Sequence, residues 1–262
     1  MPSSRRKTAG TGGLSGAALK YIAMLSMVMD HIGAVILERV VYYRGNLDGV
    51  AGVMGSEWGD VLYGMSRVCR IAGRISFPIY AFLLVEGFLH TRDWRRYWLR
   101  LAVFALISEI PFRLAVLNAW TGGRLNVFVE LAAGLLVLRL LKEWGRLSES
   151  SRTAAYAVSV GAGCVLVYLL KADYDIEGIL LISACYLLRE SRPAQALTVG
   201  VLSFLESMEW GYGAGALAAL PLFLYNGRKG RTRWRYGFYL FYPVHLLLLF
   251  LIRRFIIGIP MG

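Results

Sequence analysis

Long apolar stretches recur along the whole chain and are separated by shorter polar connections. Most of them approach the roughly 20 residues that an α-helix needs to cross about 30 Å of hydrocarbon. The chain should therefore fold as an all-α, polytopic transmembrane bundle of about nine helices. The stretches comprise residues 21–43, 65–89, 97–117, 125–141, 153–170, 176–188, 194–205, 212–225 and 236–258.

The sixth and seventh stretches, residues 176–188 and 194–205, are short for a full crossing. Two interpretations are open: flanking residues complete each span, or the pair forms a re-entrant hairpin that enters and leaves on one side. The hairpin would leave about seven spans. Neither interpretation changes the side on which the two termini lie.

Positive charge marks one side of the membrane. Lys and Arg residues gather before the first stretch, after the second, fourth and sixth, and most densely at positions 228–235. Because cytoplasmic connections carry the excess of Lys and Arg, these connections and the amino terminus should be cytoplasmic. The longest connection, residues 44–64, then faces outward, as an ordinary solvated loop or as a loop that meets substrate.

Composition points to the same class of protein. Of 262 residues, 57% are hydrophobic and 18% are charged, and the mean hydropathy of +0.53 exceeds that of a soluble domain. A net charge of +12 would suggest nucleic acid binding in a soluble protein, but here the cations lie between apolar stretches. We therefore expect a multi-pass protein of the inner (cytoplasmic) membrane, with lipid and not nucleic acid as its surroundings.

The chain divides into a short tail and one domain. Residues 1–18 are rich in Ser, Gly, Thr and Ala and should form a disordered cytoplasmic tail, followed by one transmembrane domain over residues 19–262. The first apolar stretch lacks a small-residue cleavage site and should be retained. The three cysteines stand alone, with no CxxC and no histidine at zinc spacing, so we expect no metal site.

Ionisable residues lie inside the first three stretches. A charge near the bilayer centre costs about 2.5 to 3.5 kcal/mol, so each such residue needs a partner or a function. Asp30 and His31 lie about ten residues into the first stretch, near its middle. The others are Arg74, Glu86 and His90 in the second stretch and at its end, and Glu109 and Arg113 in the third.

Asp30 and His31 should have different roles, because adjacent helical residues point about 100° apart. Asp30 shares its face with the small residues Ala23, Ser26, Gly33 and Ala34. Another helix can approach such a seam closely, and we expect an ion pair between Asp30 and Arg74. His31 shares a face with Lys20, since eleven residues advance a helix by about three turns and about 16 Å. The alternative is that the buried charges only lock helices together.

Several segments of the first half resemble one known family. They are residues 19–25 with 29–35, 73–78 with 81–88, and 104–112 followed by 125–128. These segments resemble the TraX family, whose named member is a conjugative F-type pilin N-acetyltransferase. The specific resemblance covers about residues 18 to 135, with a weaker echo from Asp173-Tyr174 to Gly178 and at Tyr242-Pro243-Val244-His245.

The TraX family is similar to the broader integral membrane acyltransferases, in which a basic residue precedes a catalytic histidine on the first helix. Lys20 and His31 match that spacing. The resemblance also implies an arginine pair after the second stretch, for which Arg92/Arg95 and Arg96/Arg100 are open alternatives. It implies acetyl-CoA as acyl donor.

We therefore expect an acyltransferase, most simply an acetyltransferase, that carries an acyl group from cytoplasmic acetyl-CoA to an acceptor amine or hydroxyl in or beyond the membrane. The acceptor could be a peptide such as pilin or an envelope glycan. His31 would be the general base, and Asp30 with Arg74 would fix its geometry. The other candidates are Lys20, Arg92, Arg95, Arg96 and Arg100 for the CoA phosphates, and Glu86 and Glu109 for orienting His31 or the acceptor. Direct transfer and an acyl-histidine intermediate both stay open.

A proton-coupled transporter is the competing class, because buried Asp, Glu, His and Arg residues are equally natural there. The sequence has no internal repeat of the kind that many transporters show. A non-catalytic membrane assembly factor would leave His31 without an explanation. Recognition of acyl-CoA separates the enzyme from both alternatives.

Overall fold

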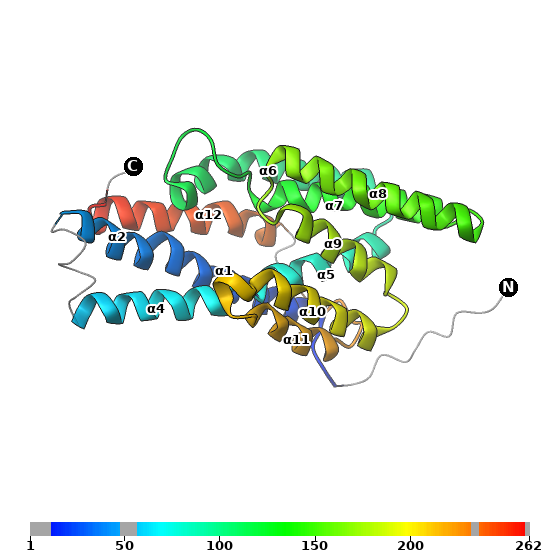
Figure 1. Cartoon of the computed structure of the whole chain (residues 1–262), viewed down its shortest axis with the longest axis horizontal. Coiled ribbons are helices and arrows are strands. Elements are labelled where there is room, and N and C mark those ends of the chain that lie inside the picture. The colour runs from blue at the N-terminus through cyan, green and yellow to red at the C-terminus, as the bar shows by residue number, and fades with distance from the viewer. Residues whose placement is uncertain (1–11, 48–56, 232–235, 260–262) are drawn as a thin grey trace.

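The computed structural model describes residues 12–47, 57–231 and 236–259, and these residues form a helical bundle (Figure 1). The helices are α1 (Gly16–Ile32), α2 (Glu38–Leu47), α4 (Glu57–Gly73), α5 (Ser76–His90), α6 (Trp94–Phe112), α7 (Val127–Trp144), α8 (Glu149–Leu170), α9 (Asp175–Leu187), α10 (Arg192–Gly211), α11 (Ala219–Phe223) and α12 (Gly237–Leu251). Short π-helical turns η1 (Gly33–Leu37), η2 (Arg113–Leu117) and η4 (Ile252–Ile256) follow α1, α6 and α12, and a 3-10 turn η3 (Ala214–Ala218) precedes α11. Within the described residues there is no strand, so the all-α prediction is confirmed.

Four helical stretches of the described chain are long and apolar enough to cross a membrane. They are Gly16–Tyr42, Glu57–His90, Glu149–Leu170 and Gly237–Ile256. Large apolar side chains such as Leu106, Val158 and Ile256 are exposed on the outside of the bundle, which suits a surface that meets lipid. The protein is therefore a membrane protein. The count of nine spans and the cytoplasmic amino terminus stay predictions.

The second predicted span is broken in two. Instead of one continuous helix over residues 65–89, α4 ends at Gly73 and α5 begins at Ser76. Pro78 explains the break, because its ring would clash with the carbonyl of Arg74 four positions earlier and it has no N–H to donate. Pro78 is tolerated where it lies, in the first turn of α5.

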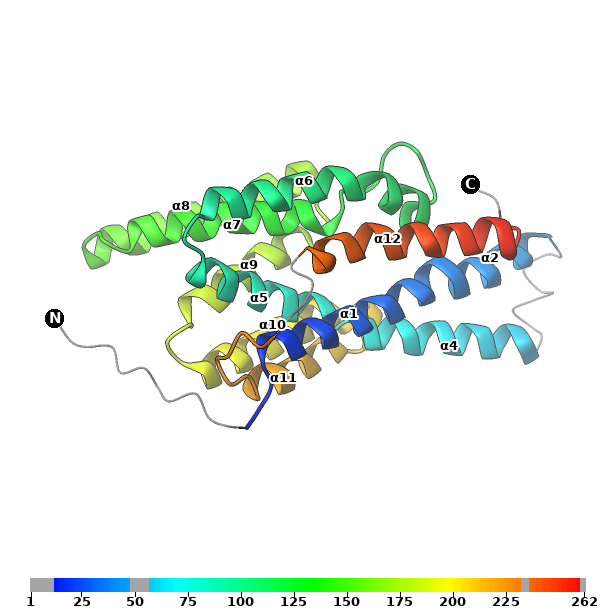
Figure 2. The same cartoon turned by 180° about the vertical axis from the view of Figure 1, so that it is seen from behind.

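The seam between α1 and α4 has the small residues that the sequence predicts. Gly33 packs against Ser66 and Cys69, where an added Cβ would lie 3.0 Å from Cys69 Cβ. Ser26 Oγ donates a hydrogen bond of 2.7 Å to the carbonyl of Ala72. Close contact through small side chains is the usual way in which helices associate in membranes. In both views α4 lies alongside the continuous stretch formed by α1, η1 and α2, with its C-terminal end beside α1 (Figures 1 and 2).

The last residues of the predicted tail belong to the folded bundle. The predicted tail, residues 1–18, overlaps α1, which begins at Gly16 and is capped by the Ser15 hydroxyl. Leu14 N–H donates to the carbonyl of Leu224 at 2.8 Å, and Gly16 N–H donates to that of Arg228 at 2.8 Å. These hydrogen bonds satisfy backbone N–H groups before and at the start of α1. The composition of the segment does not predict such long-range partners. Residues 1–11 lie outside the described residues.

The predicted outer connection, residues 44–64, is also partly helical. Its last part, from Glu57 onward, forms the first turns of α4. Residues 48–56 lie outside the described residues, so neither interpretation of this connection is tested.

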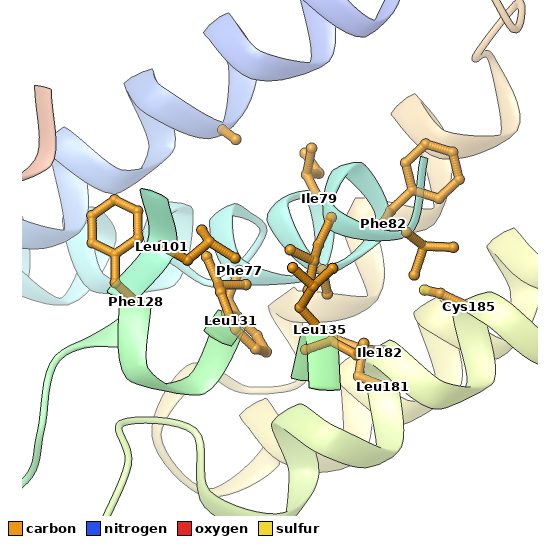
Figure 3. Close-up of a cluster of buried hydrophobic side chains, with 14 of the residues drawn as sticks. Phe77, Ile79, Phe82, Leu101, Phe128, Leu131, Leu135, Leu181, Ile182 and Cys185 are labelled. Atoms are coloured by element: carbon orange, nitrogen blue, oxygen red, sulfur yellow. The ribbon is translucent and has the colours of Figure 1, made fainter. Parts of the chain in front are cut away.

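The centre of the bundle is built around α5. Nine of its fifteen residues are buried, on all sides of the helix, which is typical of a helix enclosed by others. Ile79 and Phe82 of α5 belong to one buried cluster with Leu135 of α7 and with Ile182 and Cys185 of α9 (Figure 3). Gly134 leaves room for the Ile182 side chain, so α7 and α9 approach closely. This core fixes α5 as one wall of the site described next.

Candidate active site

A cavity of about 520 Å³ lies between α1, α5, α6, α7 and the start of α12. Its lining includes Lys20 at one end of α1 and His31 three turns further along the same helix. At a rise of 1.5 Å per residue, these two residues are about 16 Å apart along the helix axis. The face of α1 that Lys20 and His31 share is therefore one wall of this cavity.

One end of the cavity is basic, and we call it the basic end. It is lined by Lys20 from α1, Arg100 from α6 and Lys229 from the segment before α12. Lys20 Nζ lies 5.0 Å from the centre of the Phe238 ring, and Arg100 lies 5.5 Å from the Tyr97 ring. Lys229 is exposed, so this end opens to the outside. Three cations from three elements make it suitable for a polyanionic ligand.

The other end, the histidine end, combines a base with carboxylates and phenols. Its lining includes His31, Asp30, Asp173, Tyr174 and Tyr242. The His31 and Tyr242 rings meet edge to face at 5.9 Å. Burial raises the pKa of Asp173 to about 6, against the opposing charge of Arg124. The cavity therefore joins a basic mouth to an interior lined by titratable side chains.

His31 has a partner from the far end of the chain. Its Nδ1 lies 2.7 Å from Nε2 of His245, which is 214 positions later in the sequence. His245 Nδ1 in turn donates to the carbonyl of Phe241 at 2.7 Å. The His245 ring stacks on Phe241 and is only 7% exposed. The sequence singled out the segment that contains His245 but gave no reason to pair it with His31.

Asp30 forms its ion pair with Arg70, and not with Arg74 as predicted. Asp30 Oδ2 lies 2.6 Å from Nη1 of Arg70, one turn earlier on α4. Arg70 also contacts Glu38, with Nε 3.5 Å from Oε1. Gly73 lies directly against the Asp30 side chain, where a Cβ would collide with it. The carboxylate thus joins α1 to α4 through Arg70.

Arg74 does not pair with Asp30, because α4 ends at the preceding residue, Gly73. Arg74 lies in the break between α4 and α5 and its Nη1 is 3.5 Å from Oε1 of Glu206 on α10. Its side chain packs on Gly211, where a Cβ would lie 2.8 Å from Arg74 Cγ. In one continuous helix Arg70 and Arg74, four positions apart, would share a face, and the break between α4 and α5 separates them.

Of the two secondary carboxylates, only Glu86 lines the cavity. It accepts a hydrogen bond of 3.0 Å from the Tyr225 hydroxyl and lies 3.7 Å from Arg192 Nη1. These contacts hold the cavity wall, and none of them is to His31.

Glu109 lies outside the lining and is engaged elsewhere. Its carboxylate is 2.8 Å from Arg113 Nε and accepts a hydrogen bond of 2.7 Å from Asn126. The structure therefore places Glu109 in a contact between α6 and the start of α7, and not beside the base.

The arginine cluster is divided among several places. Arg100 lines the cavity, whereas Arg92 lines a smaller hollow of about 60 Å³ with Arg139 and Lys142. Arg95 lies 6.0 Å from the Trp94 ring. Arg96 pairs with Asp93 at 3.0 Å and is 83% exposed. Both alternative pairs are thus split, because only Arg100 turns inward from the start of α6.

Comparison with known proteins gives one family and one named relative. A family model described as "TraX protein" matches residues 15–253, which include every residue of the cavity lining. A protein of Dichelobacter nodosus, "Probable fimbrial assembly protein FimC, serogroup H1", is 27% identical over 256 residues, covering 90% of this chain and 94% of the relative. No solved structure matches.

Proposed function

The chain belongs to the TraX family, and on that premise we propose that it is a membrane-embedded acyltransferase, most simply an acetyltransferase that uses acetyl-CoA. The observation that carries the proposal is one cavity with cations at its open end and, at its inner end, His31, which is hydrogen-bonded to His245. An acyl-CoA has the matching form, with anionic phosphates at one end and a reactive thioester at the other. Lys20 and His31 are separated by about 16 Å, so both ends can be engaged together.

The basic end suits the phosphates. Charge-assisted hydrogen bonds from ammonium and guanidinium groups to phosphate are short and strong. Lys20, Arg100 and Lys229 would supply them from three different elements. Lys229 replaces most of the predicted arginine cluster in this role, because Arg95 and Arg96 are engaged outside the cavity.

The walls between the two ends suit the uncharged arm of the donor. The cavity lining includes the apolar side chains of Leu83, Leu84, Leu101 and Phe128. Apolar surface favours a flexible chain of methylenes and amides over a hydrated ion. Binding of the arm here would place the thioester beside His31 and exclude bulk water from it.

His31 would act as general base. It takes the proton from the acceptor amine or hydroxyl as the nitrogen or oxygen of that group bonds to the thioester carbonyl carbon. It then returns the proton to the CoA thiolate, which leaves when the C–S bond breaks. Asp30 and Arg70 would support this step by holding α1 against α4. An acyl-histidine route would use the same residue as nucleophile.

The acceptor we favour is a peptide destined for the cell surface. The Dichelobacter nodosus relative is named as a probable fimbrial assembly protein, which fits acylation of a pilin-like chain before or during assembly. An envelope glycan is the alternative acceptor. We place the basic end on the cytoplasmic side of the inner membrane, where acyl-CoA is available and where the excess of Lys and Arg should lie.

Acetyl-CoA binding tests the proposal. Purified protein in detergent should gain thermal stability as acetyl-CoA is added, by an amount that rises with concentration as mass action requires. S-acetylpantetheine, which lacks the phosphates, should stabilise it much less. No shift at millimolar acetyl-CoA would reject the enzyme and favour a proton-coupled transporter. If acetyl-CoA binds, release of free CoA thiol in the presence of a peptide, but not in the presence of a glycan, would identify a peptide as the acceptor.

A further inference from the structure

We propose that His245 is a positioning residue that fixes the tautomer of His31, leaving the His31 Nε2 lone pair available to the cavity. The consequence for catalysis rests on the proposed function. The tautomer itself does not, because it follows from two hydrogen bonds between described residues.

The first of these bonds orients His245. Its Nδ1 lies 2.7 Å from the carbonyl oxygen of Phe241, and a carbonyl can only accept. Nδ1 of His245 must therefore carry hydrogen. In a neutral imidazole the other nitrogen is then an acceptor, so Nε2 of His245 presents a lone pair.

The second hydrogen bond, between His245 Nε2 and His31 Nδ1, then determines the tautomer of His31. Its Nδ1 lies 2.7 Å from that lone pair, so it must donate, and the hydrogen of the neutral His31 ring is on Nδ1. Nε2 is left without hydrogen. Because His31 lines the cavity and its Nδ1 is committed to α12, Nε2 is the nitrogen that can accept a proton from a bound acceptor.

The surroundings make this orientation rigid. His245 stacks on Phe241 with ring centres 4.9 Å apart and an interplanar angle of 15°. Tyr242 meets both imidazoles edge to face, at 5.9 Å from His31 and 5.8 Å from His245. A histidine in water carries its hydrogen mostly on Nε2, which would block the base. The packed ring of His245 selects the less common form.

The same contact serves the reaction after proton transfer. When His31 has taken a proton on Nε2, its Nδ1–H donates to His245 Nε2 as a charge-assisted hydrogen bond. Such bonds are about twice as strong as neutral ones. His245 thus stabilises the imidazolium that forms, in addition to selecting the productive tautomer.

Nitrogen NMR tests the assignment directly, because the chain has only three histidines. The full chain, labelled with ¹⁵N in its histidines and held in lipid nanodiscs, should show His31 with hydrogen on Nδ1 and an unprotonated Nε2. His31→Gln and His90→Gln spectra assign the signals. His245→Leu removes the acceptor and should move His31 to the Nε2–H form. His245→Gln offers a carbonyl oxygen in place of Nε2 and should keep the wild-type form.

Activity provides the second readout. His245→Leu should lower kcat roughly 100-fold, at the lower end of what a general base contributes, with acetyl-CoA binding unchanged. His245→Gln should retain most of the rate. An Nε2–H form of His31 in the wild type, or the same His31 spectrum in wild type and His245→Leu, would overturn the proposal. If the wild type has the Nδ1–H form but transfers no acyl group, the tautomer assignment stands and the acyltransferase proposal fails. The wild-type spectrum and His245→Gln decide the question even if His245→Leu does not fold.

Discussion

At the scale of single residues, two features of α1 define the candidate chemistry: a histidine that lines the cavity and an aspartate that ties α1 to its neighbour. They are adjacent in sequence, yet His31 contacts α12 and Asp30 contacts α4. This separation follows from the turn of about 100° between adjacent helical residues. Substitutions at the two positions should therefore have different effects, one on reaction rate and the other on stability.

Replacing His31 should remove transfer and leave ligand binding in place. His31→Gln deletes a base that acts only during reaction, so transition-state stabilisation is lost and ground-state affinity is not. We expect kcat to fall by about 10² to 10⁴-fold, with an unchanged thermal shift on adding acetyl-CoA.

The matched control is His90→Gln, since His90 also lines the cavity but its Nδ1 donates to the Glu86 backbone carbonyl, one turn earlier on the same helix. It should retain the rate. Wild-type turnover by His31→Gln would remove the catalytic assignment.

Asp30 should couple energetically more strongly to Arg70 than to Arg74. In a double-mutant cycle of unfolding midpoints, Asp30→Asn with Arg70→Gln should show an interaction of about 1 to 3 kcal/mol, because the two groups form a close pair. Asp30→Asn with Arg74→Gln should show a smaller interaction, since the ion pair of Arg74 is with Glu206 and Arg74 acts on Asp30 only as a second nearby charge. A larger interaction in the Asp30/Arg74 cycle than in the Asp30/Arg70 cycle would instead support the ion pair between Asp30 and Arg74 that the sequence predicts.

At the scale of helices, the contact between α1 and α4 depends on residues with small side chains or none. Gly73 is the last residue of α4 and lies against Asp30, where a Cβ has no room. Glycine is costly in a helix by about 1 kcal/mol relative to alanine, so its presence here reflects packing. Gly73 and Pro78 together end α4 where it packs against α1. The break that follows directs the Arg74 side chain toward Glu206 on α10.

Substituting alanine for this glycine tests the seam. Gly73→Ala should lower the thermal unfolding midpoint in detergent and reduce transfer, because either Asp30 or the whole of α4 must move. Overpacking of this kind costs about 1 to 3 kcal/mol.

Gly64→Ala on the same helix is the control, since a Cβ there meets open space and alanine favours helix by up to about 1 kcal/mol. Equal midpoints for the two variants would show that α1 and α4 do not pack as described.

At the scale of the whole molecule, the basic end is assembled from distant parts of the chain. Lys20 is on the first helix, Arg100 on α6 and Lys229 before the last helix. The backbone bonds of Leu14 and Gly16 to Leu224 and Arg228 bring the first and last of these together. Anchoring the start of α1 in this way positions Lys20 and Lys229 on one rim.

Charge reversal at this rim should weaken acetyl-CoA binding selectively. Lys20→Glu, Arg100→Glu and Lys229→Glu should each raise the apparent Kd for acetyl-CoA by tenfold or more, about 1.4 kcal/mol, and change that for S-acetylpantetheine little. Phosphates are the strongly anionic part of the donor, so only the phosphorylated ligand is affected.

Arg96→Glu serves as control, because Arg96 is exposed and pairs with Asp93 outside the cavity. Equal losses for both ligands would indicate that the rim supports folding and not phosphate binding.

The sequence by itself determined the helices, the family and the stripe that joins Lys20 to His31. Helical hydrogen bonds and the period of apolar residues are local, and two residues on one helix keep their relation in any fold. The TraX resemblance seen in the first half of the chain is confirmed by a match over residues 15–253. The break at Arg74 also had a local signal in Pro78, which the continuous apolar pattern hid.

Only the tertiary structure decided which residues meet. Arg70 and Arg74 are equivalent by helical spacing, and the end of α4 at Gly73 selects one of them for Asp30. His245 and Lys229 come from near the end of the chain, and no spacing relates them to the first helix. Partner choice depends on distances between helices, which arise from packing over the whole bundle and are not encoded in any local period.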